Sequence, residues 1–515
     1  YQGLGELDKA EEYFRKACQL DPLNSNFHNN LGFVLLQNGN HHDALVSLES
    51  AIRIQPDHAE AYNNLGNTLR KLLRFEQAVL AYQKAVQIKP NYAKAHSNLG
   101  NALRETGHLE YSIESFRKAI SIHAIYPEAF SNLSITFIAL GKYHEAIDAC
   151  NKALTIKPDF AEAYNNLGNA LKAQGVLDKA KEAYAQAIKL QPNFADALYN
   201  LSLLRLKNGE WESGWKGFEY RFDVSKAVSD KFISKKPLWD GLCVESLFVW
   251  AEAGIGDEVM YASCIDELWD YTDHLIVSCD SRLLPIFSRS FHQSITFVEK
   301  VSCMADEWFD SQISIGSAFG YLRQTDESFE ARKEPYLKVD DNKRDYLRKK
   351  LKAVSNSRKI VGISWRSSAS KDAENRSLDL LDLVNSIPDE FCLVNLQYGD
   401  VVAEISRVEE STGREIICFD DIDNFNDLDD FCALIQACDF VISIDNSTVH
   451  FAGAVGTECH VLLPFSHQSD WRWGLNGTPD SYHYRDMHLY WQSEPNCWQT
   501  CLSNLQKKSA SYVFK

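Results

Sequence analysis

A glycine turn that ends in a carboxylate, Gly254-Ile255-Gly256-Asp257, follows a short apolar run and precedes a helical pattern. Two glycines permit a tight turn with close backbone approach, and the helix that follows offers free N–H groups to a ligand. A carboxylate in that place can act as a general base toward a hydroxyl group, so Asp257 is a candidate base. The alternative is that Asp257 only caps the helix. The turn is not a dinucleotide fingerprint, because GxGxxG would need glycine at Val259.

A small, polar and basic loop at residues 366–371 follows another apolar run, and a further arginine lies shortly beyond it. Arg366 and Arg376 can contact a diphosphate in a bidentate way. The hydroxyl of Ser367 and neighbouring backbone amides can complete the shell of such a ligand. The alternative is an ordinary loop whose charges are solvated.

A third polar loop, residues 443–450, joins the most apolar run of the second half to a helix with small residues at 452–454. Asp445 can orient this loop, while Ser447 and Thr448 can donate to a phosphate from the start of the helix. His450 lies on the first turn of that helix. A lone histidine is more often a packed residue of the core or surface, but its polar neighbours favour a functional interpretation.

Two further groups of residues resemble metal sites, and we interpret both as structural. The acidic run Asp420–Asp430 contains two DxD triplets. Acidic residues favour the start of a helix, so we expect Asp427 or Asp429 to cap one. Cys497 and Cys501 lack companion ligands, and packing near the C-terminus is the better explanation for them. The sequence therefore predicts no metal site.

Short apolar runs that alternate with amphipathic stretches indicate parallel strands with crossover helices in the second half of the chain. We predict strands at 247–251, 275–278, 296–298 and 312–315 in a first lobe, and at 360–365, 392–397, 416–419 and 440–444 in a second. The charged stretch 340–359 is predicted to be a linker and a helix. Two Rossmann-like lobes form a cleft, and ligands collect at the carboxyl ends of their strands. The three polar loops should therefore share one cleft.

The first half of the chain repeats with a period of 34 residues. Proline marks this lattice at Pro22, Pro56, Pro90, Pro158 and Pro192, with Ala124 in the remaining place. Small residues that keep the same step, such as Ala44 and Ala78, let antiparallel helices approach, and proline ends the second helix of each unit. This pattern resembles the tetratricopeptide repeat (TPR) and predicts an α-solenoid. Five full repeats should run from about 25 to 194, followed by a divergent one at 195–225.

The last, divergent repeat is rich in large aromatic residues. They are Trp211, Trp215, Phe218, Tyr220 and Phe222. We expect them to seal the end of the solenoid against the next domain, because a repeat array buries its core only between neighbours and needs caps at its ends.

One position of the repeat is asparagine in six successive units. The column consists of Asn30, Asn64, Asn98, Asn132, Asn166 and Asn200. A carboxamide both donates and accepts, so a ladder of them can hold the backbone of an extended peptide whatever its side chains are. The alternative is that these side chains only join neighbouring helices. The sequence leaves both interpretations open.

Composition and charge limit the class of protein. Apolar residues make up 45% and charged residues 24% of the 515 residues, as in an ordinary folded protein. Residues 1–210 hold 22 basic and 22 acidic side chains, and the remainder holds 31 and 49, so nucleic acid is not the expected partner. No run is long enough for a membrane span. The 13 scattered cysteines indicate reduced thiols and a cytoplasmic protein. The chain begins at Tyr1, partway through a repeat, and looks like a fragment of something longer.

Eight motifs follow one another between about residues 237 and 495: PLWDG, WAEAGIGDEV, VGISWRSS, NRSL, LQYGD, DDFCALIQACDFVISIDNSTVHFAGAVG, VLLP and DWRWG. In this order they resemble the glycosyltransferase domain of bacterial TPR proteins. That domain is similar to heptosyltransferases and more distantly to O-GlcNAc transferase. The resemblance implies a GT-B fold of two Rossmann-like lobes and transfer with inversion at the anomeric carbon, without a metal ion or any cofactor besides the nucleotide-sugar donor.

The same resemblance implies roles for individual residues. Asp257 corresponds to the catalytic base, and Arg376 lies near a basic residue that meets the donor phosphate. The donor-phosphate loop corresponds to Asp445, Asn446, Ser447 and His450. The nucleobase and ribose of the donor would lie near Gln397, Tyr398 and Asp400. Asn446 and Ser447 stand where heptosyltransferases carry threonine and glycine, which leaves the sugar open. Trp471 and Trp473 would either face the sugar or pack against the C-terminal helix.

The expected organisation is TPR repeats at 1–225, a joint at 226–245, an N-terminal GT-B lobe on the acceptor side at 246–345 and a C-terminal lobe on the nucleotide-sugar side at 346–515. The expected function is transfer of a sugar from a nucleotide sugar to a hydroxyl group of an acceptor protein that lies in the solenoid. Two alternatives are a non-catalytic scaffold with a degenerate sugar-nucleotide fold, and a transferase that acts on a glycan or lipid.

Overall fold

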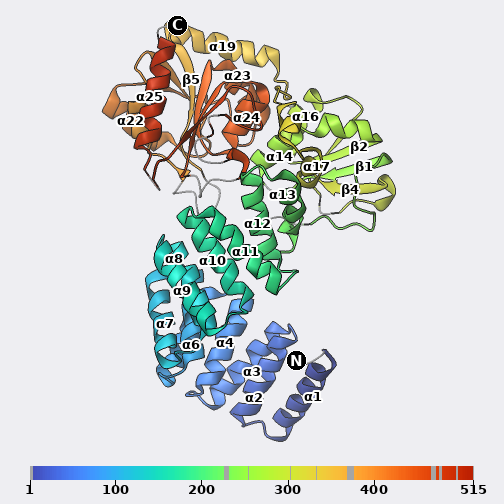
Figure 1. The fold of residues 1–515 in the computed structure, drawn as a ribbon, viewed down its shortest axis with the longest axis vertical. Helices are drawn as coiled ribbons and strands as arrows, with labels where there is room; N and C mark the ends of the chain where they lie inside the picture. Colours follow the sequence, from blue (N-terminus) through green and yellow to red (C-terminus); the bar gives the residue numbers. More distant parts are fainter. Residues whose placement is uncertain are drawn as a thin grey trace. The chain divides into compact units, whose positions relative to one another are not determined.

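The computed structural model describes residues 4–224, 231–252, 254–301, 303–331, 333–367, 376–465, 471–474, 478, 480–494 and 497–513. They belong to two compact units, Tyr1–Phe194 and Ala195–Lys515 (Figure 1). In the part of the chain that is described, no helix is both long and apolar enough to cross a membrane. All 13 cysteines are free thiols, and eight of them are buried.

The first unit consists of antiparallel helices in pairs. They are α1 (Leu4–Leu20), α2 (Ser25–Gln37), α3 (His41–Ile54), α4 (Ala59–Lys71), α5 (Phe75–Ile88), α6 (Ala93–Glu105), α7 (Leu109–Ile122), α8 (Pro127–Ala139), α9 (Tyr143–Ile156), α10 (Ala161–Gln174) and α11 (Leu177–Leu190). Each pair from α2 and α3 to α10 and α11 matches one period of 34 residues. The five predicted repeats are confirmed.

The glycines of the lattice let the two helices of one repeat approach closely. A Cβ atom on Gly168 would lie 2.5 Å from Cε1 of Tyr184, and a Cβ atom on Gly66 would lie 2.5 Å from Cε1 of Tyr82. The fourth repeat has serine at the glycine position, Ser134, and its large residue is replaced by Cys150, which Ser134 contacts. Each small residue is thus matched to the volume of its partner.

Replacing Gly168 with serine is expected to lower the stability of the first unit by about 1–3 kcal/mol, because the new atoms overlap the Tyr184 ring. Adding Tyr184→Cys should recover part of the loss, since the pair then matches Ser134 and Cys150. Thermal unfolding followed by circular dichroism at 222 nm checks both variants. Equal unfolding temperatures for the Gly168→Ser variant and the parent chain would contradict this packing account.

The second unit begins with a last helical pair, α12 (Ala195–Lys207) and α13 (Trp211–Phe218), which continues into η1 (Glu219–Phe222). The aromatic residues of α13 are buried against the α/β part. The Trp215 ring lies 5.8 Å from that of Phe319, and its Nε1 donates to the carbonyl oxygen of Arg323 at 2.7 Å. The predicted sealing role of these aromatic residues is confirmed within this unit.

The N-terminal lobe is a parallel sheet of four strands in the order β3-β2-β1-β4. Its elements are β1 (Val244–Trp250), α14 (Ile255–Ala262), α15 (Ile265–Leu268), η2 (Trp269–Tyr271), β2 (Thr272–Cys279), η3 (Ser281–Leu283), α16 (Leu284–Ser290), β3 (Thr296–Glu299), η4 (Asp306–Trp308), β4 (Ser311–Ser314), α17 (Ile315–Leu322) and α18 (Asp326–Glu330). Strand β1 is central, with Leu247 paired to Leu275 on one side and to Ser311 on the other. The four predicted strands are confirmed, with small shifts at their ends.

The C-terminal lobe is a parallel sheet of six strands in the order β10-β9-β8-β5-β6-β7. Its elements are α19 (Asp341–Ser355), β5 (Lys359–Ser364), α21 (Leu380–Ser386), β6 (Phe391–Asn395), α22 (Val402–Thr412), β7 (Ile416–Ile417), α23 (Leu428–Ala437), β8 (Phe440–Ile444), α24 (Ser447–Val455), β9 (Cys459–Leu463), η5 (Trp471–Trp473), β10 (Met487–Trp491) and α25 (Gln499–Val513). Helices α22 and α25 cover one face of the sheet, and α23 and α24 cover the other (Figure 1). Strands β9 and β10 were not predicted.

The strand order places the polar loops at the point in each sheet where the chain stops adding strands on one side of the first strand and starts adding them on the other. In the C-terminal lobe β5 leads to β6 and β7 on one side, whereas β8 returns to pair with β5 on the other. The loops after β5 and β8 therefore flank the switch point, where ligands of such sheets bind. In the N-terminal lobe β4 returns beside β1, so the Gly254 turn has the equivalent position.

Candidate functional site

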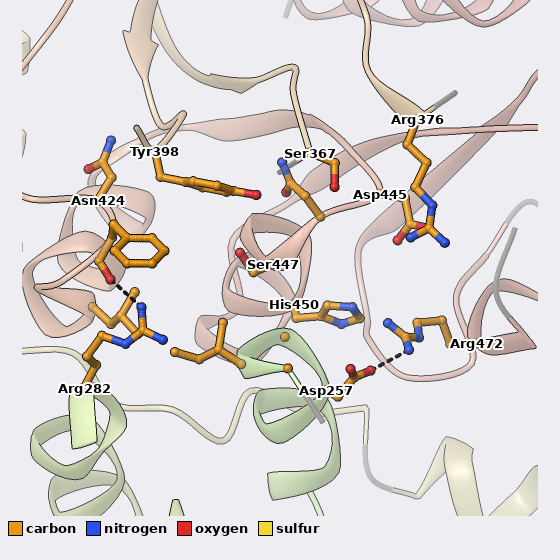
Figure 2. Close-up of a pocket in the computed structure, with 16 residues that line it drawn as sticks. Asp257, Arg282, Ser367, Arg376, Tyr398, Asn424, Asp445, Ser447, His450 and Arg472 are labelled. Carbon is orange, nitrogen blue, oxygen red and sulfur yellow. Dashed lines mark hydrogen bonds and ion pairs between the residues drawn. The ribbon is translucent and has the colours of Figure 1, made fainter. Parts of the chain in front are cut away.

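A cavity of about 300 Å³ lies at the carboxyl ends of β1, β5 and β8 (Figure 2). Ten of its lining residues are ones that the sequence predicts for the site: Gly254, Gly256, Asp257, Ser367, Arg376, Tyr398, Asp445, Asn446, Ser447 and His450. Ile255, Arg282, Asn424, Phe425, Leu428 and Arg472 complete the wall. Segments nearly 200 residues apart in the sequence thus meet at one place. Of the loop predicted at 366–371, only Arg366 and Ser367 fall within the described residues.

The glycine turn after β1 places a carboxylate at the cavity. Gly254 is the N-cap of α14, and Asp257 is the third residue of that helix, so Asp257 is not the cap. Its Oδ1 accepts a hydrogen bond of 2.5 Å from Nη2 of Arg472. A Cβ atom on Gly256 would lie 3.1 Å from Cδ2 of His450, so glycine there lets α14 approach α24. The ion pair stabilises the negative charge of Asp257 at the cavity.

The loop after β8 is held by its own side chains. Asn446 is the N-cap of α24: its Oδ1 accepts from the Thr448 N–H at 3.0 Å, and its Nδ2 donates to Oγ of Ser364 at 2.7 Å. This cap leaves Ser447 at the cavity wall. Thr448 does not line the cavity, because its side chain points back toward β5 and is fully buried, with its Oγ1 3.5 Å from Oγ of Ser364. Only Ser447 of the two hydroxyl residues can meet a ligand here.

His450 is a buried member of the same helix. Its ring is 2% exposed, stacks on Trp473 at 5.5 Å and hydrogen-bonds through Nδ1 to the hydroxyl group of Tyr484 at 3.1 Å. Burial, followed by the charges of Arg472 and His483, holds the pKa of His450 well below its usual 6.5. The imidazole is therefore neutral at physiological pH and is a hydrogen-bonding group rather than a cation.

The depressed pKa of His450 has a consequence for stability. Below about pH 6.5 the unfolded chain binds a proton that the folded chain does not, so stability is lost as the pH falls. We expect the His450→Gln variant to lose this contribution, which is up to about 1.4 kcal/mol per pH unit. Urea unfolding of both chains at pH 7, 6 and 5, followed by tryptophan fluorescence, measures the difference. Parallel pH dependences would contradict a buried, neutral His450.

Both tryptophans of the DWRWG motif are buried. Nε1 of Trp473 donates to Oδ1 of Asp445 at 2.9 Å, and the Trp471 ring packs against Trp215 at 5.1 Å. Neither lines the cavity. Trp473 packs against α24 and Trp471 packs against α13, instead of the C-terminal helix. Arg472, which lies between them, faces the cavity and Asp257.

The loop after β5 contributes the guanidinium group of Arg376, which makes no hydrogen bond within the described part of the chain. Nη1 of Arg376 lies 3.6 Å from Oδ2 of Asp445, and its side chain is 27% exposed. An arginine in this state can bind a phosphate group in a bidentate way. The N-terminus of α24 lies at the same cavity, and the positive end of its helix dipole favours an anion there.

The opposite end of the cavity is built around Arg282, which follows β2 (Figure 2). Its guanidinium group donates to both carboxylate oxygens of Asp280 at 2.8 Å and to the carbonyl oxygen of Phe425 at 3.0 Å. It also lies 4.7 Å from the centre of the Phe425 ring. The backbone N–H of Asp280 donates to buried Glu258, and burial raises the pKa of Glu258 to about 7. Arg282 thus fixes an aromatic wall opposite Tyr398.

A second cavity of about 680 Å³ adjoins this end. It shares Ser367, Tyr398 and Phe425 with the first and is also lined by Arg366 and Gln397. Oε1 of Gln397 accepts from the backbone N–H of Arg366 at 2.8 Å, so this side chain shapes the loop. The side chain of Arg366 turns away from Asp257. It donates to the carbonyl oxygen of Asp400 at 3.1 Å and lies 3.6 Å from Glu404.

The asparagine column of the first unit joins neighbouring repeats. Nδ2 of Asn64, Asn98 and Asn166 donates to Asn29, Asn63 and Ser131, each at 2.9 Å and each 35 residues earlier. The interpretation that the column joins helices is confirmed for these three. The same side chains stay partly exposed, as do those of Asn132 and Asn200, while Asn30 is exposed. The carboxamide of Asn132 makes no hydrogen bond within the described residues.

Arg472 and Arg282 are site residues that the sequence analysis missed. Arg472 lies 215 residues from Asp257, and its signal is the alternation in DWRWG, where two buried tryptophans leave the residue between them on the other side. Arg282 follows the carboxyl end of β2, a strand end without a glycine turn. In the acidic run, Asp427 caps α23 as predicted, by accepting from the Asp430 N–H. No group of three or more histidine, cysteine or acidic residues among those described could hold a metal ion.

Comparison with known proteins identifies the first unit. Family models described as tetratricopeptide or TPR repeats match residues 1–22, 24–91, 93–124, 135–175 and 168–209. The N-terminal unit is a TPR solenoid. FlbA of Caulobacter vibrioides is 30% identical over 312 residues, covering 57% of this chain and 51% of FlbA. The chain therefore spans about half the length of this curated relative.

Solved structures resemble the repeats. The match to MamA has 23% sequence identity and a TM-score of 0.30, and it covers 33% of this chain and 93% of MamA. YrrB, described as a TPR protein with an unusual peptide-binding site, is 22% identical over 37% of this chain and 97% of its own, with a TM-score of 0.31. A TPR protein from Parabacteroides merdae is 19% identical over 43% and 88%, with a TM-score of 0.39.

Proposed function

We propose that the second unit is a metal-independent glycosyltransferase of the GT-B type that uses a nucleotide-sugar donor. The observation that carries this proposal is the meeting of three strand-end loops at one cavity. They bring a carboxylate, Asp257, an arginine, Arg376, and the N-terminus of α24 together. A base for an acceptor hydroxyl and a site for a diphosphate are the two parts that such a transfer needs.

The donor would lie along the cavity in one direction. Its diphosphate fits the N-terminal end of α24, where Ser447 lines the cavity, the helix dipole favours an anion and Arg376 offers a guanidinium group. The nucleoside then lies toward Tyr398 and Phe425, whose rings are 6.1 Å apart. The sugar lies at the other end, beside Asp257 (Figure 2).

In the proposed reaction Asp257 takes the proton of an acceptor hydroxyl as its oxygen attacks the anomeric carbon of the sugar. The bond between that carbon and the diphosphate oxygen breaks on the opposite face, so the configuration inverts. The electron pair leaves with the nucleoside diphosphate, whose growing charge Arg376 and the start of α24 stabilise. Arg472 is hydrogen-bonded to Asp257. When Asp257 takes the proton and loses its negative charge, the Arg472 guanidinium group can turn to the phosphate, where negative charge develops.

Calorimetry separates this proposal from a non-catalytic scaffold. UDP, GDP, ADP and CDP are titrated into the whole chain, and one of them should bind with a Kd in the low micromolar range. The Arg376→Met variant should bind that nucleotide at least about tenfold more weakly, because it loses a charged hydrogen-bonding partner. The matched control is Arg407→Met, which alters an exposed arginine outside the cavity. No heat with any of the four nucleotides would favour the scaffold.

We further propose that the acceptor is a protein segment held by the asparagine column, and that the protein works in the cytoplasm, where thiols stay reduced. Asn132 tests the acceptor, because its carboxamide takes no part in the bonds between repeats. Asn132→Ala should raise the KM for a protein acceptor by roughly two- to tenfold, the worth of one hydrogen bond, with an unchanged unfolding temperature.

The control for this variant is Asn151→Ala, which removes an exposed asparagine from α9. Initial rates at several acceptor concentrations measure both variants. An unchanged KM for Asn132→Ala, together with unchanged values after Asn98→Ala and Asn166→Ala, would favour a glycan or lipid acceptor.

A further inference from the structure

The carboxylate of Asp445 is almost completely buried, and only one of its two oxygen atoms accepts a hydrogen bond from the described residues. Its side chain is 4% exposed and lines the cavity. Oδ1 accepts a hydrogen bond of 2.9 Å from Nε1 of Trp473. Oδ2 is buried and accepts no hydrogen bond from any described residue. Its nearest cationic partner is Nη1 of Arg376 at 3.6 Å, a distance too long for a hydrogen bond.

A buried carboxylate oxygen without a hydrogen-bond donor is costly, and most such groups in proteins have a partner. Here Arg376 supplies a compensating charge 3.6 Å away. A diphosphate that enters the cavity competes for this arginine, because phosphate oxygens bind guanidinium in a bidentate way. A ligand that takes Arg376 therefore leaves Oδ2 with a second negative charge beside it and no donor.

The ligand itself can correct this deficit if it carries a hydroxyl group. A hydroxyl donates one hydrogen bond and can point at Oδ2, whereas the oxygens of an ionised diphosphate only accept. The position of Asp445 fits the sugar end of the cavity. Trp473, which donates to Asp445, stacks on His450, and a Cβ atom on Gly256, in the turn that carries Asp257, would lie 3.1 Å from the His450 ring. Asp445 lies on the same side of the cavity as His450 and Asp257 (Figure 2).

We propose that Oδ2 of Asp445 accepts a hydrogen bond from a hydroxyl group of the donor sugar, and that the cavity thereby prefers the intact nucleotide sugar to the nucleoside diphosphate. This inference rests on the proposed function. Before transfer, sugar and diphosphate satisfy Asp445 and Arg376 together. After transfer, the sugar hydroxyl leaves with the product, Oδ2 is unsatisfied again, and release of the nucleoside diphosphate is favoured.

Competitive calorimetry on the whole chain tests the preference. Each nucleoside diphosphate is compared with its own sugar esters, namely UDP with UDP-glucose and UDP-N-acetylglucosamine, GDP with GDP-mannose, and ADP with ADP-glucose. In the parent chain, the best sugar ester should bind at least about tenfold more tightly than its diphosphate. In Asp445→Asn the ratio should fall toward one, mainly because the diphosphate binds better when an amide N–H replaces the carboxylate oxygen. The control is Asp421→Asn, an exposed carboxylate outside the cavity, for which the ratio should not change.

An unchanged ratio in Asp445→Asn would overturn the inference and leave the proposed function standing. If the parent chain binds neither member of any pair, the proposed function fails, and this inference fails with it. A second measurement needs no variant. In the parent chain, a methyl ester of the same nucleoside diphosphate has no hydroxyl group to offer, and it should bind like the diphosphate. Binding of the methyl ester as tight as that of the sugar ester would also overturn the role of Asp445.

Discussion

Replacing Asp257 with asparagine is expected to lower the rate of sugar transfer by a factor of about 10²–10⁴, with the Kd for the nucleoside diphosphate changed little. The carboxylate lies at the start of α14, at the end of the cavity proposed for the sugar, and its Oδ1 is paired with Arg472. Asparagine has the same size but cannot take the proton of an acceptor hydroxyl. Initial rates with a radiolabelled nucleotide sugar, measured at saturating donor, give the effect on turnover.

The binding measurement separates loss of the base from loss of the site. The proposed phosphate site consists of the start of α24 and Arg376 and does not include Asp257, so calorimetry with the nucleoside diphosphate should show nearly full affinity in the variant. Asp266→Asn is the matched control, because Asp266 is an exposed carboxylate in the same lobe. Undiminished transfer by Asp257→Asn would remove Asp257 from the mechanism. Loss of binding in this variant would mean that it holds the structure of the site instead.

Replacing Glu252 with glutamine should destabilise the second unit by about 3–5 kcal/mol, because the buried Arg221 loses its buried counter-charge and keeps only the half-exposed Glu219. Arg221 and Glu252 are each 2% exposed and are joined by two hydrogen bonds of 2.7 Å. The same guanidinium group donates to the hydroxyls of Ser314 and Ser317, and Glu252 accepts from the Gly316 N–H at 3.0 Å. The pair ties the end of the helical segment to β1 and α17, just before the Gly254 turn.

Tryptophan fluorescence during urea unfolding measures this loss selectively, since all 11 tryptophans lie in the second unit. Glu330→Gln, which removes an exposed carboxylate paired with Lys333, should change the same transition by less than about 1 kcal/mol. The double variant Arg221→Met with Glu252→Leu should recover part of the loss, since neither charge is then left unpaired. A shift below about 1 kcal/mol for Glu252→Gln would show that solvent reaches the pair.

The repeats and most strands could be predicted because their signals are local and periodic. Each glycine or proline of the 34-residue lattice has a steric reason, as Gly66 and Gly168 show, where a Cβ atom would overlap a tyrosine ring. The fully buried strand β8 was predicted with both its ends, because Phe440–Ile444 is apolar apart from Ser443 and polar residues bound it. Strands β9 and β10 contain His460, His488 and Tyr490, which interrupt the apolar pattern. His460 hydrogen-bonds to Tyr490, and His488 hydrogen-bonds to Glu458.

The site was predictable where one segment supplies both the fold signal and the chemistry. The loops at Asp257 and Ser447 follow buried strands and precede helices, and parallel topology brings their strand ends together. What could not be predicted depends on contacts across the unit. The direction of Thr448 is set by Ser364 on another strand, and the partner of Asp257 comes from residue 472. Whether Arg366 or Arg376 faces the cavity depends on Glu404, which draws Arg366 away.

A crystal structure of the whole chain with its best-bound nucleoside diphosphate tests the central claim most directly. The account predicts the diphosphate at the start of α24, within hydrogen-bonding distance of Ser447 and of the Arg376 guanidinium group. The nucleoside should lie on the side of Tyr398 and Phe425, with the space beside Asp257 left for the sugar. A nucleotide bound outside this cavity, or one whose base occupies the space beside Asp257, would contradict the account.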